Sequence, residues 1–188
     1  MSRVARLLLL VVVLLATATV TAKTRNVTDP DAPRSLPAEG PVQVQWTDPG
    51  EFSDLKFSSN RWRAAQGNWV EQLAEHLRES AQKRLPAGER MEVTITDIKR
   101  AGRYEPWHGM HLQDVRFLRD HYPPSMALEF RHYDANGQLI AEGTREMRDI
   151  GFLTTGSNPG ARDNLYYEKR MIDGWVRDEL RRSEVASH

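Results

Sequence analysis

The chain of 188 residues contains no cysteine. Without a thiol it carries no disulfide, no cysteine nucleophile and no acylated cysteine of the lipoprotein type. An ordinary packed core must therefore hold the fold, and a domain of this length buries about 70% of the surface of its unfolded chain. That length suits one domain and is too short for two.

Net charge is also missing, because 26 basic residues balance 26 acidic ones. Nucleic-acid-binding domains normally carry a surplus of lysine and arginine, so we expect no nucleic-acid partner. The arginines near the end of the chain are interleaved with acidic residues, as on a solvated helix face. They are Arg177, Arg181 and Arg182, among Asp178, Glu179 and Glu184.

The common catalytic motifs are absent as well. The sequence has no Gly-x-Ser-x-Gly elbow, no phosphate-binding loop, no dinucleotide fingerprint and no His-Glu-x-x-His pair. Nothing in it points to a nucleotide cofactor or to the usual hydrolase mechanisms. We expect no cofactor and no metal, and we favour a protein without enzymatic activity.

The one long apolar run lies at the start of the chain. Two arginines precede the aliphatic residues 7–15, and small residues follow up to Ala22. This order is typical of a secretory signal peptide, whereas a transmembrane helix needs about 20 apolar residues. We predict a signal peptide over residues 1–22 that is cleaved after Ala22, with Ala18 as the second choice and an uncleaved anchor as the alternative. The mature protein is then expected in the periplasm, without a stable membrane span.

Residues 23–41 are polar and contain four prolines. Such a segment buries little apolar surface, so we predict a flexible polar leader. The rest of the chain, residues 42–183, is predicted to form a single domain.

Alternating apolar and polar residues predict five strands in this domain. The first covers residues 42–46, where three apolar side chains alternate with two glutamines. Asp134-Ala135-Asn136-Gly137 is typical of a tight turn, so the fourth and fifth strands are expected to form a hairpin. The later strands are predicted over residues 91–96, 115–117, 126–131 and 138–147.

Apolar residues at steps of three and four predict two helices. The first is capped by residues 58–60 and runs to about Leu85, where Pro86 and Gly88 end it. The second begins at Asp163 or Asn164. The element order is strand, helix, four strands, helix. We therefore predict an α+β domain: an antiparallel sheet of about five strands with two helices packed on one face.

Several short patterns follow one another from Val42 to Trp175. They are Trp46-Thr47-Asp48-Pro49 with Phe52 and Asp54, Leu85-Pro86-Ala87-Gly88, Asp97 with Ala101-Gly102, Asp114-Val115-Arg116, Tyr122-Pro123-Pro124, Arg148-Asp149, and Tyr167-Glu168-Lys169 with Trp175. In this order and spacing they resemble an exported bacterial family, domain of unknown function 3016. The resemblance implies an exported bacterial protein with no assigned activity, so it transfers no catalytic residue. The loop 107–111 is not part of the pattern.

Asp97 and Asp149 are the candidates for acid and base chemistry. Asp97 shares the parity of Ile95 in its strand and Asp149 shares that of Met147, so both are predicted to approach the buried side of the sheet. A buried carboxylate needs a partner, for which the candidates are Arg116, Arg119 and Arg148. The pair either performs general acid and base catalysis or, as we favour, forms ion pairs or turn caps. A β-bulge would reverse the parity.

His108 and His111 lie three residues apart, and Asp114 follows them. Two imidazoles and a carboxylate can bind zinc or a similar metal. However, a helical turn usually holds such a pair, and Gly109 places these histidines in a loop. We therefore interpret them as surface or structural residues, with a metal site as the alternative.

The sequence has five tryptophans. Four occupy apolar positions of predicted elements and are expected in the core, namely Trp46, Trp62, Trp69 and Trp175. Trp107 lies in a loop and is the candidate for an exposed contact residue.

We therefore expect a periplasmic domain that binds a protein partner or an envelope component through the loops 101–113 and 151–162. A shallow apolar patch around Trp107 is expected in that case. The alternative is a hydrolytic enzyme that uses the paired carboxylates or the loop histidines. That alternative predicts a cleft holding at least two of these groups.

Overall fold

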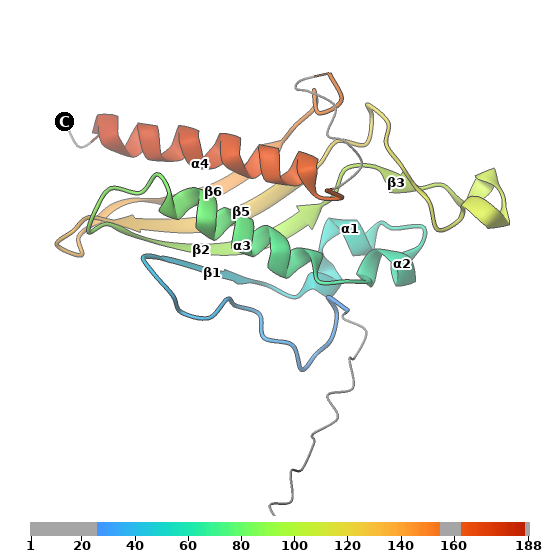
Figure 1. Cartoon of the computed structure of the whole chain (residues 1–188), viewed down its shortest axis with the longest axis horizontal. Helices are drawn as coiled ribbons and strands as arrows, with labels where there is room; N and C mark the ends of the chain where they lie inside the picture. Colours follow the sequence, from blue (N-terminus) through green and yellow to red (C-terminus); the bar gives the residue numbers. More distant parts are fainter. Residues whose placement is uncertain (1–25, 155–162, 187–188) are drawn as a thin grey trace, which may run out of the picture.

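A computed structural model describes residues 26–154 and 163–186 of the chain (Figure 1). The predicted signal peptide, residues 23–25 of the predicted leader and residues 155–162 of the second loop lie outside these ranges. Within them, no helix combines the length and the apolar character that a membrane crossing requires. The α+β class predicted from the sequence is confirmed.

The main sheet has four strands in the order β1-β2-β5-β6. Strands β2 (Arg90–Lys99), β5 (Ser125–Tyr133) and β6 (Leu139–Arg148) are antiparallel neighbours, but β1 (Val42–Trp46) runs parallel to β2. The sheet thus differs in detail from the predicted antiparallel sheet of about five strands, because it has four strands and one of them is parallel to its neighbour. A parallel neighbour requires a crossover connection, and the helices between β1 and β2 supply it. Periodicity along a strand contains no information about its direction.

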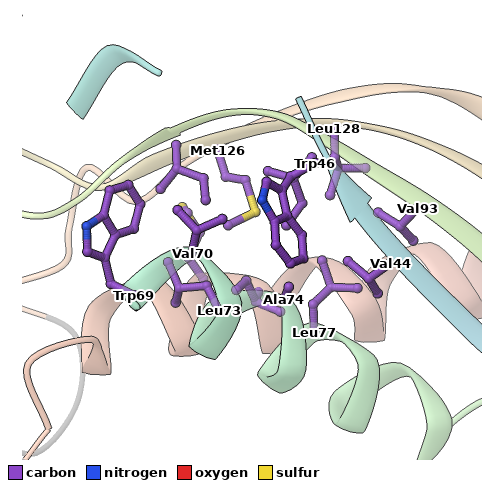
Figure 2. Packing of buried hydrophobic residues seen from close by; sticks show 14 of the residues in the cluster. Val44, Trp46, Trp69, Val70, Leu73, Ala74, Leu77, Val93, Met126 and Leu128 are labelled. Atoms are coloured by element: carbon purple, nitrogen blue, oxygen red, sulfur yellow. The ribbon is translucent and has the colours of Figure 1, made fainter. Parts of the chain in front are cut away.

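Helices α3 (Trp69–Gln82) and α4 (Tyr166–Ala186) cover one face of this sheet and lie side by side (Figure 1). The apolar stripe of α3 packs on the inward side chains of β1, β2 and β5, as Figure 2 shows. Val44 and Trp46 of β1 meet Leu73 and Leu77 in this core. The other sheet face carries polar side chains, consistent with a sheet that is solvated on one side.

The single long helix predicted from residue 60 to Leu85 is divided in two. Asn60 caps α2 (Arg61–Ala65) through the backbone N–H of Arg63, and α3 starts only after Gly67. Gly67 has a φ of 91°, which an L-residue rarely adopts and which interrupts the helix. The break rotates α2 relative to α3. Trp62 is therefore 65% exposed, which corrects its predicted core position, whereas Trp69 is 3% exposed.

The predicted third strand does not join the main sheet. Instead β4 (Arg116–Phe117) pairs with β3 (Arg103–Tyr104) in a separate two-stranded ribbon. Two short 3-10 helices, η2 (Pro106–His108) and η3 (Met110–Leu112), connect the two strands. We call residues 103–122 the lobe, and Figure 1 shows its 3-10 helices projecting beyond the sheet.

Residues 26–41 are not the flexible leader that the sequence predicted. The backbone N–H of Leu36 donates to the carbonyl of Val44 at 2.9 Å, and that of Trp46 donates to the carbonyl of Arg34 at 2.9 Å. This segment therefore pairs along the outer edge of β1, and Leu36 is only 8% exposed. Prolines are tolerated there because an edge segment leaves alternate N–H groups unpaired.

A short α1 (Ser53–Lys56) and the 3-10 helix η1 (Pro49–Glu51) follow β1 directly. Asp48 accepts a hydrogen bond from the backbone N–H of Gly50 and so caps η1. Phe52 and Leu55 are fully buried between these turns and the sheet. Their burial fixes α1 against β2. Asp54, which lies between these two residues in the sequence, is thereby placed at the junction with the lobe.

The contrast between two tryptophans tests this packing. We expect Trp69→Ala to lower the free energy of unfolding by about 3–5 kcal/mol, because it removes a buried aromatic side chain. Trp62→Ala should change it by less than about 0.5 kcal/mol, since the ring is mostly in water. Urea denaturation followed by circular dichroism measures both. Equal losses for the two variants would mean that one continuous helix buries both rings.

Candidate functional site

The lobe is joined to the rest of the domain through a buried carboxylate. The side chain of Asp54 in α1 is 0% exposed. Its two oxygens accept hydrogen bonds from Arg100 Nε at 3.0 Å, Arg100 Nη2 at 2.7 Å and the Arg100 backbone N–H at 2.9 Å. Arg116 of β4 donates a further bond through Nη2 at 2.5 Å. One acid thus bonds two guanidinium groups from different parts of the chain.

Arg100 extends this junction to two more helices. Its Nη2 also donates to the carbonyl of Ala64 at the end of α2, at 2.8 Å. Its guanidinium lies 4.1 Å from the ring centre of Trp69 in α3, a cation–π geometry. Asp54 and Arg100 together therefore connect α1, α2 and α3 at one point.

Helix α4 contributes a second buried acid. Glu168 is 1% exposed and accepts the backbone N–H of Ala101 at 2.6 Å through Oε1. Its Oε2 accepts no hydrogen bond from any residue in the described ranges, and the same holds for Nε and Nη1 of Arg116 as donors. Burial raises the pKa of Glu168, while the nearby arginines act in the opposite direction. We call Asp54, Arg100, Arg116 and Glu168 the Asp54 cluster.

A second ionic cluster lies inside the lobe. Glu105, with a side chain 3% exposed, accepts a bidentate pair of bonds from Arg119, Nε at 2.9 Å and Nη2 at 2.7 Å. The hydroxyl of Tyr122 donates to it at 3.0 Å, and Nε2 of His108 lies 2.8 Å away. The hydrogen bonds from Arg119 lower the pKa of Glu105 to about 2. This Glu105 cluster ties the two arms of the lobe together.

The outer surface of the lobe carries large exposed apolar side chains. Trp107 is 62% exposed and Met110 is 83% exposed. The ring of His108 lies between Trp107 and Phe117, with centroid distances of 6.1 Å and 4.9 Å. His108 therefore connects the Glu105 cluster to these two rings.

A shallow hollow separates the lobe from α2. It is lined by Ser59, Asn60, Trp62, Pro106, Gln113 and Asp114. Asn60 spans it, because its Nδ2 donates both to the Gln113 carbonyl at 3.1 Å and to Asp114 at 3.0 Å. Trp62, whose ring is exposed, thus lines the same hollow as Pro106, the residue that precedes Trp107.

A wider concavity of about 1480 Å³ lies elsewhere, between residues 26–38 and the polar sheet face. Its sheet wall is built from solvated Gln, Thr, Glu and Arg side chains. Gln45 donates to Thr94 at 2.9 Å there, and Arg131 and Glu142 are 3.7 Å apart. The Asp54 and Glu105 clusters and the exposed rings of Trp62 and Trp107 do not line this concavity.

Asp97 and Asp149 serve separate structural contacts. A β-bulge between Ile95 and Asp97 places Asp97 opposite Ala127, which reverses the parity predicted from the sequence. Asp97 then accepts the backbone N–H of Ser53 at the start of α1 at 2.6 Å. Asp149 accepts from Arg170 of α4 at 2.5 Å. The two carboxylates have no common partner, and neither bonds an arginine named from the sequence.

The two histidines of the predicted pair also have separate surroundings. His108 bonds Glu105 and lies 3.3 Å from Arg119, whereas His111 is at the exposed surface in η3. Asp114 bonds Asn60. In the part of the chain that the structure describes, no three histidine or acidic side chains gather as metal ligands do.

The sequence reasoning missed Glu105 and placed no role on Asp54 beyond the family pattern. The spacing of Glu105 and His108, one helical turn apart, was an available local signal. Asp54 had none, because its partner Arg116 is 62 residues away.

The fold and this site define a small α+β domain that presents an aromatic lobe on a buried ionic junction. Residues 40–178 match a family described as protein of unknown function (DUF3016), and the chain belongs to that family. No curated protein and no solved structure matches it. Residues of four separate patterns that support this membership meet in the structure, namely Asp54, Ala101, Arg116 and Glu168.

Removal of the charge of Asp54 tests the junction. We expect Asp54→Asn to lower the free energy of unfolding by about 3 kcal/mol, because two buried guanidinium groups lose their shared carboxylate. The matched control is Glu51→Gln, a nearby acid that is 72% exposed and 3.4 Å from Lys56. An exposed pair of this kind contributes less than about 1 kcal/mol. Urea titration of both variants measures whether loss of the buried carboxylate lowers the free energy of unfolding more than loss of the exposed one.

The depressed pKa of Glu105 predicts acid sensitivity. Its folded pKa of about 2 lies below the ordinary value of 4.5, so the ionised carboxylate stabilises the fold fully above pH 4.5. That contribution is lost as the pH falls through 2. Glu105→Gln should therefore be less stable than the parent at pH 6, with a smaller difference at pH 3.

Urea midpoints at pH 6, 4 and 3 measure this effect, and the exposed Glu39→Gln serves as the control. The control should follow the parent at each pH. A deficit of Glu105→Gln that stays constant over the whole range would contradict the assignment of this pKa.

Proposed function

We propose that the protein is exported to the periplasm and binds a protein partner or an envelope component through the lobe, without catalysis. The export part rests on the start of the sequence, where arginines, an aliphatic run and small residues succeed one another up to Ala22. The mature chain then begins at Lys23. The absence of cysteine is compatible with an oxidising compartment, because the packed core needs no disulfide.

The binding part rests on one observation, the exposed apolar side chains of the lobe and of the neighbouring α2. Trp62, Trp107 and Met110 are each more than 60% exposed. Large apolar side chains in water are unfavourable, and contiguous apolar surface of this kind marks interaction sites. Tryptophan and methionine are also enriched where proteins contact one another.

The buried ion pairs of the lobe and its junction support a binding role rather than a catalytic one. The carboxylates of Asp54 and Glu105 are bonded to arginines within the domain, so both acids hold the lobe in place. A partner then meets rings that are already positioned, which reduces the entropy lost on binding. Asp97 and Asp149 stabilise backbone and helix contacts instead of facing each other.

Photo-crosslinking in bacteria tests the proposal. The full chain is produced with a photo-reactive amino acid in place of His111 in the lobe. We expect the cleaved product to start at Lys23, to fractionate with the periplasm and to form a discrete adduct with an envelope component. Trp107→Ser combined with Met110→Ser should reduce that adduct at least tenfold, because the apolar contact is lost.

The control places the photo-reactive residue at Asn136, in the turn between β5 and β6 at the far end of the sheet. This position should give no adduct of the same size. Ile150→Ser removes another exposed apolar side chain, 74% exposed, and should leave the lobe adduct unchanged. A product with residues 1–22 retained in the cytosol, or an adduct unaffected by the lobe variant, would refute the proposal.

A further inference from the structure

The polar face of the main sheet carries a row of cations at the end next to the lobe. Lys99 of β2 and Arg148 of β6 both pair with Ser125 of β5, so the three residues lie in line across three strands. Their neighbours Ile98, Met126 and Met147 face the helices. Side chains alternate along a strand, so Lys99, Ser125 and Arg148 project together from the other face. The Cα atoms of the two cations are about 10 Å apart, twice the strand spacing.

Arg103 adds a third cation beside this row. The chain turns back after β2 at Gly102, which has a φ of 82° and donates its N–H to the carbonyl of Tyr122 at 2.9 Å. A Cβ at Gly102 would lie 2.7 Å from the Phe117 carbonyl oxygen, so only glycine permits this close turn. Arg103 then begins β3 on the exposed side, because its neighbour Tyr104 is buried.

The three cations are close enough to act on one another. Burial lowers the pKa of Lys99, and the positive charges of Arg148 and Arg103 lower it further. Asp54 acts in the opposite direction. Arg148 and Arg103 are thus near enough to Lys99 for their charges to act on its ammonium group. An anion bound among the three side chains would relieve the repulsion.

Three of the four acids near this row are bonded elsewhere. Asp54 holds Arg100 and Arg116, and Asp97 accepts the N–H of Ser53. Asp149 bonds Arg170. Glu146 lies in the next row of the same face, opposite Ala127.

Ion pairing differs between the two ends of this sheet face. At the end away from the lobe, Arg90 lies 2.7 Å from Glu92 and Arg131 lies 3.7 Å from Glu142. Across residues 26–154 and 163–186, by contrast, Lys99, Arg103 and Arg148 form no ion pair within 4.0 Å. The three cations without an ion pair therefore lie together at the end beside the lobe.

We infer that Lys99, Arg103 and Arg148, with the hydroxyl of Ser125, form a binding site for a phosphate group. Lys99 and Arg148 flank the Ser125 hydroxyl, and Arg103 adds a second guanidinium group beside them, so these groups can bind several oxygens of one tetrahedral anion. Arginine binds phosphate in a bidentate manner. The phosphate belongs either to a small soluble ligand or to a lipid headgroup. The site lies on the sheet face and does not depend on the apolar surface of the lobe.

Two probes separate these sources. The purified protein is titrated with inorganic phosphate by isothermal calorimetry at low salt, and it is mixed with phosphatidylglycerol vesicles in a flotation assay. Saturable binding of phosphate without flotation identifies a soluble ligand. Flotation, with or without phosphate binding, identifies a lipid headgroup as the natural phosphate source.

The double variant Lys99→Gln with Arg148→Gln should weaken either interaction at least tenfold, because two of the three charges are removed. The matched control Arg131→Gln removes an exposed, already paired cation from the same sheet face and should stay within twofold of the parent. Thermal unfolding of both variants reports whether the fold is kept. Failure of both probes to bind the parent, or equal binding by a folded double variant, overturns the inference.

Discussion

The buried carboxylate of Asp54 is the interaction on which the rest of the site depends. Two guanidinium groups, from the end of β2 and from β4, converge on an acid that water does not reach. Moving three charges out of water is costly, and only complete hydrogen bonding offsets the cost. The lobe can therefore adopt only an orientation that brings Arg116 to Asp54.

A fixed junction explains how an apolar surface can project from a small domain. The Glu105 cluster closes the lobe internally, and the Asp54 cluster attaches it to α1, α2, α3 and α4. Both clusters use arginine, whose planar group satisfies several acceptors at once. The buried carboxylate of Glu105 thus lies inside the lobe, whereas Trp107 and Met110 are exposed on its surface.

Local patterns predicted much of the core and little of the site. The alternation in Val42, Val44 and Trp46 identified β1 and its buried side correctly. The same reasoning failed at Trp62, because one glycine with a positive φ ends the helical period, and at Asp97, because one bulge shifts the parity of β2. In each case a single backbone irregularity overrode a pattern that assumes regular geometry.

By itself the sequence determined the α+β class, the family, the inward faces of the strands and the exclusion of thiol-based chemistry. These properties depend on composition and on the spacing between residues close together in the sequence, and both can be read directly from the sequence. The tertiary structure decided the parallel direction of β1, the separate ribbon of the lobe and the partners of Asp54, Glu105 and Asp149. Many arginines could satisfy a given carboxylate, and the choice among them is made only by the three-dimensional packing that brings distant residues together.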